Sequence, residues 1–180
     1  MQTRRKFLAS VIALSSQCAL PAASLYPVQA KASASWPLWM RRGKDEWRFD
    51  AATEEGYRAA MWLLRDVQAN RMGYPHPRLL YLLSWMQSWL AAHKIHSLID
   101  ATSGMRLQHT NVKIEGAAKG SFHLPDENNY FFATDFRARG LDAPYTAKLL
   151  QAVGMGGIGV YWQRDFVHAD VGRPRTWKGK

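Results

Sequence analysis

Gly157-Ile-Gly-Val-Tyr-Trp-Gln-Arg-Asp-Phe-Val-His-Ala-Asp-Val-Gly172 is the stretch that decides the fold. Its β-branched and aromatic residues surround one short polar break, which predicts two strands joined by a turn at residues 163–165. Side chains alternate along a strand, so Phe166, His168 and Asp170 share one face and the residues between them face the core. An imidazole and a carboxylate on a rigid strand suit a metal site if other segments supply further ligands.

The chain before this stretch changes from helical to extended patterns. Apolar residues at helical spacing predict a helix that begins at Thr53 and is ended by Gly73 and Pro75, and a second from Pro77 to about residue 93. The remaining predicted elements are strands at 97–102 and 130–136, a polar loop at 103–120 and a helix at 143–153. This order indicates an α+β domain whose small, mostly antiparallel sheet is flanked by helices.

The first 30 residues are typical of an export signal. Thr3-Arg-Arg-Lys-Phe-Leu8 is a twin-arginine opening, and Val28-Gln-Ala30 follows the apolar run as a small-residue cleavage pattern. The apolar run is too short and too polar for a stable membrane span. We therefore expect export by the twin-arginine route, to the periplasm, with a linker at 31–44 and one domain at 45–178.

Charge and cysteine content narrow the function classes. The net charge of +10 becomes +7 without the three basic residues of the first 30, which favours a polyanionic partner such as cell-wall polymer. Export argues against nucleic acid. Cys18 is the only cysteine and lies in the expected signal, so a thiol nucleophile is excluded. Gly154-Met-Gly-Gly-Ile-Gly159 imitates a dinucleotide-binding motif, but it follows a helix and leads into a strand, the reverse of the required order.

Two further residues could complete a metal site with His168. His123 stands at the end of the glycine-bearing loop, and Asp135 lies on the strand predicted after it. Two histidines and one carboxylate, with a fourth position open for water, are the arrangement of catalytic zinc. The three residues are far apart in the sequence, so no local motif anchors the set.

The chain also resembles a known family over residues 45–178. The motifs that carry the resemblance follow one another in order: Asp100-Ala-Thr-Ser-Gly-Met-Arg106, Ser121-Phe-His-Leu124, Ala133-Thr-Asp-Phe136, Phe166-Val-His-Ala-Asp-Val-Gly172 and Arg175-Thr-Trp177. They are similar to the motifs of the YcbK/MepK-like murein endopeptidases. That family belongs to the zinc D-alanyl-D-alanine peptidases, which have the hedgehog/DD-peptidase fold.

The resemblance implies a zinc peptidase that acts on peptidoglycan. Zn²⁺ would be held by His123, Asp135 and His168, and it would lower the pKa of a bound water from 15.7 to about 7. Arg106 would hold a substrate carboxylate or polarise the scissile carbonyl. The hydrolysed bonds would lie in stem peptides or their cross-links.

The group that moves the proton stays open between two carboxylates. Asp165 occupies the position where related zinc peptidases have a glutamate, three residues before the last histidine. Asp170 matches the family's His-x-Asp and could be the base or could orient a ligand.

The chain departs from the family pattern between His123 and Asp135. The pattern is Ser-x-His-x-x-Gly-x-Ala-x-Asp, whereas here five residues are inserted around Asp126-Glu-Asn-Asn129 and the glycine is lost. Asp126 or Glu127 could therefore replace Asp135 as ligand, although the Ala-x-Asp-Phe context favours Asp135. A catalytically inactive relative that only binds peptidoglycan is the alternative function, and a polyanion-binding protein is a third. Whether a D,D or an L,D bond is cut, whether the enzyme is an endopeptidase or a carboxypeptidase, and the oligomeric state stay open.

Overall fold

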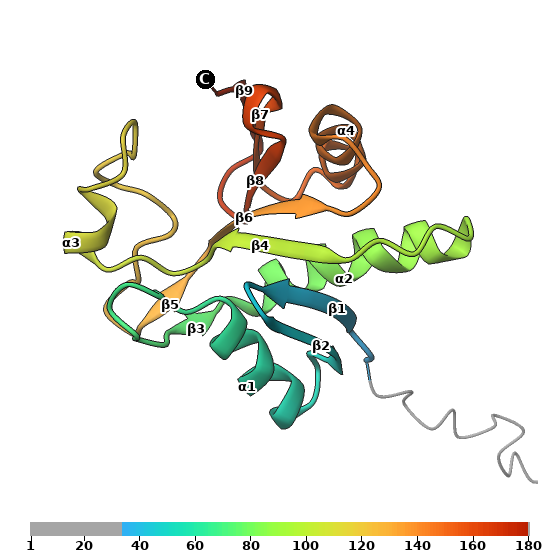
Figure 1. Ribbon diagram of the computed structural model, residues 1–180, viewed down its shortest axis with the longest axis horizontal. Helices are drawn as coiled ribbons and strands as arrows, with labels where there is room; N and C mark the ends of the chain where they lie inside the picture. The colour runs from blue at the N-terminus through green and yellow to red at the C-terminus, as the bar shows by residue number, and fades with distance from the viewer. Residues whose placement is uncertain (1–33, 180) are drawn as a thin grey trace, which may run out of the picture. The chain divides into compact units, whose positions relative to one another are not determined.

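The computed structural model describes residues 34–179, so the predicted export signal lies outside the described part. Seven strands form the main sheet in the order β2-β1-β4-β6-β8-β7-β9 (Figure 1). Their bounds are β1 (Pro37–Arg42), β2 (Asp45–Asp50), β4 (Ile99–Ser103), β6 (Ala133–Ala138), β7 (Gly157–Tyr161), β8 (Phe166–Asp170) and β9 (Arg175–Lys178). β1 pairs with β4 and β7 with β9 in parallel, and the other neighbours are antiparallel. The expected α+β class with a mostly antiparallel sheet is confirmed.

The helices of the described residues are α1 (Glu54–Leu63), α2 (Pro77–Ala92), α3 (Gln108–Asn111) and α4 (Ala143–Val153). Figure 1 shows α4 on one side of the strands β6 to β8, and α3 with its long loop on the other side. A small second sheet pairs β3 (Tyr74–Pro75) with β5 (Tyr130–Phe131). None of the helices in the described region has the length and apolar character needed to cross a membrane.

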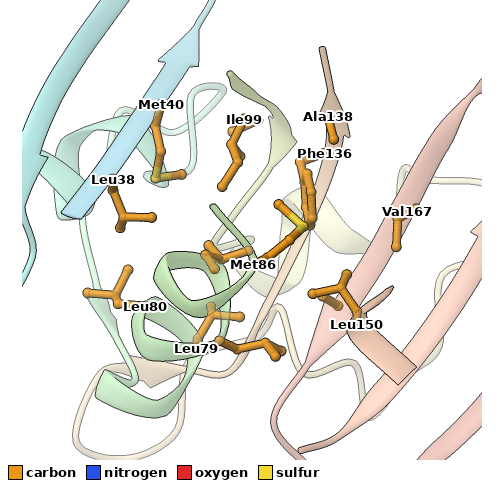
Figure 2. Packing of buried hydrophobic residues seen from close by; sticks show 14 of the residues in the cluster. Leu38, Met40, Leu79, Leu80, Met86, Ile99, Phe136, Ala138, Leu150 and Val167 are labelled. Atoms are coloured by element: carbon orange, nitrogen blue, oxygen red, sulfur yellow. The ribbon is translucent and has the colours of Figure 1, made fainter. Parts of the chain in front are cut away.

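One hydrophobic core lies between the main sheet and the helices. Figure 2 shows side chains from β1, β4, β6 and β8 meeting those of α2 and α4, with Met86, Phe136 and Leu150 among them. Val167 and Ala169 of β8 belong to this core. The alternation expected along 166–170 is therefore present, and it leaves the opposite face of β8 for His168.

The hairpin of β7 and β8 has the predicted turn. A short 3₁₀ segment, η1 (Trp162–Arg164), leads into Asp165, whose φ of 47° reverses the chain. The helix at 143–153 also has its predicted bounds. Asp142 caps it by accepting a hydrogen bond from the amide of Tyr145, and Gly154 ends it in the left-handed conformation.

The first predicted helix is shorter than expected. Thr53 does cap α1, but the helix ends at Leu63, and the prediction that it continues to Gly73 is wrong. The carbonyl of Leu64 instead accepts the amide of Met105, and Asp66 accepts the amide of Leu107 at 2.8 Å. The first contact takes the carbonyl that another helical turn would have used, and the second joins the side chain of Asp66 to the loop after β4.

Residues 37–42, expected within a linker at 31–44, form β1. Leu38 and Met40 point into the core, while Trp39 and Arg41 alternate with them on the other face. The apolar period covers only two core residues, which is too short a signal to separate a strand from a linker with scattered aromatic residues.

Candidate metal centre

A row of four paired residues crosses the C-terminal half of the sheet. Asp135 of β6 lies opposite His168 of β8, His168 opposite Gly159 of β7, and Gly159 opposite Trp177 of β9. A Cβ atom on Gly159 would lie 2.5 Å from the indole of Trp177. The glycine therefore gives the indole room to lie beside the imidazole of His168, with 5.1 Å between the ring centroids.

His123 joins this row from the loop that precedes β5. Its carbonyl accepts the amide of Arg106, which ties the loop to the segment after β4. Its Nε2 atom lies 3.2 Å from Oδ1 of Asp135 and 3.1 Å from Nδ1 of His168. Nδ1 of His168 lies 2.8 Å from the same Asp135 oxygen. Three buried side chains thus bring one ligand atom each within 4.8 Å of the others.

The outer nitrogens of both histidines have acceptors. Nδ1 of His123 lies 2.6 Å from the carbonyl oxygen of Gly104, and Nε2 of His168 lies 3.0 Å from Oδ2 of Asp170. When these nitrogens carry the protons, the inner nitrogens present lone pairs toward the carboxylate of Asp135. Two imidazole nitrogens and one carboxylate oxygen then face one another, which is a ligand set for a metal ion. The carbonyl of Gly104 and the carboxylate of Asp170 supply the hydrogen bonds that orient such ligands. The residues fit zinc.

Asp170 supports His168 and is itself held as an anion. It is fully buried and accepts the amides of Gly157 and Gly172 at 3.1 and 2.9 Å. Arg175 donates to both of its oxygens, at 3.0 and 2.7 Å. Burial alone would raise the pKa of Asp170, but the hydrogen bonds from His168, Arg175 and the two amides lower it to about 2. The contacts of Asp170 are those of an orienting group.

The protonation of the three central groups is coupled. Burial lowers the pKa of His123. Burial acts in the same direction on His168, but its hydrogen bonds to Asp135 and Asp170 outweigh it and raise the pKa. The pKa of Asp135 lies well below its usual range because the charges and hydrogen bonds of the two histidines overcome the effect of burial. The carboxylate is therefore ionised and ready to bind a cation.

Arg106 lies beside His123, Asp135 and His168, which we call the triad. Its Nε donates to Oγ of Ser103 at 2.7 Å, and its Nη2 donates to Oδ2 of Asp135, the oxygen that does not face the histidines. The side chain is buried and lines a cleft of about 350 Å³ together with His123, Asp135 and His168. A fixed guanidinium thus stands at the edge of the metal centre and reaches the space where a substrate would bind.

The insertion between His123 and Asp135 closes on itself. Oδ1 of Asp126 accepts the amides of Asn128 and Tyr130, and the following residues form β5, which pairs with β3. The metal-ligand group of the described residues contains Asp135 and neither Asp126 nor Glu127. A turn therefore accommodates the five inserted residues, and Asp135 still lies opposite His168 on the neighbouring strand.

The structure places Asp165 away from the cleft. Its Oδ1 accepts the amide of Ala143 at 3.1 Å, at the start of α4. Glu115, in contrast, is a cleft residue on the loop after α3. Sequence reasoning gave Glu115 no role, and its signals were its place in a long polar loop and in the segment Glu115-Gly-Ala-Ala118, which also carries the family resemblance.

Two other residues at the cleft were also given no role. The resemblance includes Arg175 and Trp177 without assigning them a role, but both line the cleft from β9. A signal for both did exist, because Arg175-Thr-Trp177 is one of the motifs that carry the family resemblance.

The residues of the metal centre lie within the part of the chain that matches a known protein family. A model described as peptidase M15 matches residues 59–170, which is more than half of the chain. The match includes Arg106, His123, Asp135, His168 and Asp170.

The chain is also similar to curated proteins. The probable peptidoglycan L,D-endopeptidase MepK of Haemophilus influenzae is 30% identical over 122 residues, 66% of this chain and 62% of that protein. The peptidoglycan L,D-endopeptidase MepK of Escherichia coli K12 is 32% identical over 117 residues, 63% of this chain and 60% of that protein. The matched region thus spans less than two thirds of either relative. No solved structure matches the chain.

Proposed function

Because the chain belongs to the peptidase M15 family, we propose that it is an exported zinc peptidase that hydrolyses peptide bonds in peptidoglycan stem peptides or their cross-links. The observation that carries the proposal is the buried group of His123, Asp135 and His168 at the wall of a cleft. The two curated relatives are L,D-endopeptidases by name, which favours an L,D bond as the target. The twin-arginine opening at residues 3–8 supports export.

The hydrogen bonds of each residue indicate its part in the reaction. His123, Asp135 and His168 would hold Zn²⁺, which would supply activation of water and polarisation of the scissile carbonyl. Arg106 is fixed by Ser103 and Asp135, so its positive charge stays at the cleft wall and stabilises the oxyanion that forms on the substrate. Asp170 and the carbonyl of Gly104 hold the two imidazoles in the orientation that turns their free nitrogens inward.

Glu115 is the group we assign to proton transfer. Among the described residues, Glu115 and Asp135 supply the carboxylates that line the cleft, and Asp135 belongs to the triad. The carboxylate of Asp165 accepts a hydrogen bond from the first amide of α4. The carboxylate of Asp170 is surrounded by four hydrogen-bonding groups, which are the amides of Gly157 and Gly172 and the side chains of His168 and Arg175. A general base must reach the water that it deprotonates, and Glu115 is the exposed, cleft-lining carboxylate that does not belong to the triad.

The test is a digest of purified sacculi with the zinc-loaded protein, followed by chromatography and mass spectrometry of the released fragments. We expect fragments whose new ends identify the bond cut, and none after chelation or from His168→Ala. Unchanged release by His168→Ala would contradict the proposal. Sedimentation with sacculi without any release would instead identify an inactive wall-binding relative, and binding that ignores chelators and falls steeply with salt would identify a polyanion binder.

A further inference from the structure

A second cavity, of about 360 Å³, adjoins the cleft of the metal centre. The two hollows share a wall, which contains the metal-site carboxylate and two guanidinium groups. The shared residues are Arg106, Ile114, Asp135, Arg164 and Phe166. A peptide whose carbonyl lies at the metal centre could therefore extend from one hollow into the other.

Four arginines line this second cavity, which we call the arginine cavity. They are Arg42, Arg106, Arg137 and Arg164, and the two acidic lining residues are Asp66 and Asp135. Both acids already have partners. Asp66 is buried and accepts the amides of Leu107 and Ala69, while Asp135 belongs to the triad. Four guanidinium groups against two carboxylates give the lining a formal net charge of 4 − 2 = +2.

Arg137 has no carboxylate within ion-pair distance among the residues that the structure describes. Asp100 lies directly opposite it on β4. That carboxylate is held by Arg41, which donates from Nε at 3.2 Å and from Nη2 at 2.5 Å. Arg137 donates from Nη2 to the carbonyl of Arg164 at 3.0 Å, which holds the guanidinium at the cavity wall.

Arg42 is a further guanidinium of the cavity lining that has no carboxylate within ion-pair distance in the described region. It stands at the end of β1, half-buried, with one long hydrogen bond to the carbonyl of Leu63 at 3.4 Å. Burial, with the charges of Arg65 and Arg106, lowers the pKa of Arg42 to about 10, although the charges of Asp66 and Asp135 act in the opposite direction. The group stays charged at neutral pH, and a half-buried cation without a carboxylate in ion-pair contact favours binding of an anion from solution.

We propose that the arginine cavity binds a carboxylate of the substrate peptide close to the bond that is cut, and this rests on the function proposed above. Arg137 follows Asp135 by two residues on the same face of β6, which places it roughly 7 Å along the strand. An extended peptide advances about 3.5 Å per residue, so the carboxylate belongs to a residue one or two positions from the scissile bond. Guanidinium groups bind carboxylates in two-point geometry, so the preferred substrates are peptides with an acidic residue next to the cut.

The first experiment compares isolated muropeptides with the same muropeptides after carbodiimide-mediated amidation of their carboxylates. We expect the zinc-loaded wild type to cleave the free acids with a kcat/KM about tenfold or more above that of the amides. Arg137→Gln and Arg42→Gln should lose most of this preference, chiefly through KM. Arg139→Gln removes the same charge just beyond the end of β6 and outside both cavities, so it should keep the preference.

The second experiment needs no cleavage. Calorimetry at low salt measures the binding of an acidic muropeptide and of its amide to the metal-free full chain. We expect the acid to bind more tightly, and Arg137→Gln to reduce its affinity about tenfold or more while Arg139→Gln does not.

The outcomes separate the two proposals. Carboxylate-dependent binding without cleavage by the wild type would keep the arginine cavity and overturn the peptidase. Cleavage with equal preference for acid and amide, or with a preference that Arg137→Gln retains, would overturn the arginine cavity and keep the peptidase. Because Arg137 is exposed and Arg42 is half-buried, Arg137→Gln decides the matter if Arg42→Gln folds poorly.

Discussion

Nε2 of His168 lies 3.0 Å from Oδ2 of Asp170, two residues further along the same face of β8. This contact leaves Nδ1 as the nitrogen that faces His123 and Asp135. Local alternation on one strand thus produces both a metal ligand and the group that orients it.

The first prediction concerns this orienting contact. Asp170→Asn keeps the shape of the side chain but removes the negative charge that holds the imidazole, so we expect zinc affinity to fall about 10- to 100-fold. Competition with a chromogenic chelator measures the change. Asp165→Asn, whose carboxylate lies at the start of α4, is the matched control and should bind zinc like the wild type. Equal affinities in all three proteins would contradict a role for Asp170.

The second prediction concerns acid stability of the metal-free protein. The pKa of Asp170 is about 2 in the folded state and about 3.9 in an unfolded chain, so its ionised form favours folding. The contribution, about 2 to 3 kcal/mol, is fully present above roughly pH 4 and is lost as the pH falls toward 2. Urea unfolding of wild type and Asp170→Asn should give free energies that converge over this window. A difference that does not depend on pH would contradict the assignment.

The third prediction concerns the ligands themselves. His123→Ala and Asp135→Ala should each abolish stoichiometric zinc in the purified protein, because two remaining ligands do not form a structural or catalytic zinc site. Elemental analysis measures the zinc content. His109→Ala changes an exposed histidine outside the triad and should keep about one zinc per chain. Full zinc content in Asp135→Ala would contradict Asp135 as a ligand and would favour Asp126 or Glu127 in its place.

The fourth prediction separates the candidate bases. Glu115→Gln should lower kcat on muropeptides about 10²- to 10⁴-fold without loss of zinc, because proton transfer contributes on that scale. Asp165→Asn should change kcat less than about tenfold, since its side chain can still accept the amide of Ala143. The opposite ranking of the two variants would assign the base to Asp165.

The fifth prediction concerns the row of paired residues across the sheet. Gly159→Ala places a methyl group against the indole of Trp177, and overpacking of this kind costs about 1 to 3 kcal/mol. Urea unfolding should show this loss. Gly120→Ala, where the added carbon meets open space, should leave the free energy of unfolding within about 0.5 kcal/mol of wild type. A Gly159→Ala protein as stable as wild type would mean that Trp177 moves aside freely.

Local signals in the sequence predicted much of this architecture. The hairpin of β7 and β8 and the helix at 143–153 follow from short-range alternation, turn residues and caps. The face of β8 that carries His168 and Asp170 follows from the two-residue period of a strand. The proximity of His123 and Asp135 could not come from their spacing, and it entered through the resemblance to a family.

The parts that sequence reasoning missed depend on tertiary contacts. The end of α1 is set by hydrogen bonds from Met105 and Leu107, which lie some forty residues away. The side chain of Asp165 is taken by the amide of Ala143, a contact that no pattern around Asp165 reveals. The arginine cavity joins Arg42 to Arg137 across three neighbouring strands, although neither residue stands in a recognisable motif.

The position of β9 fixes the order in which the site can be made. β9 is the last strand along the chain, yet Arg175 anchors Asp170 and Trp177 covers His168. A ribosome that has synthesised the chain only as far as β8 has made all three metal ligands but not the residues that hold His168 in place. The centre is therefore supported as described only once β9 has paired with β7, so the formation of this strand pair also sets the orientation of a metal ligand.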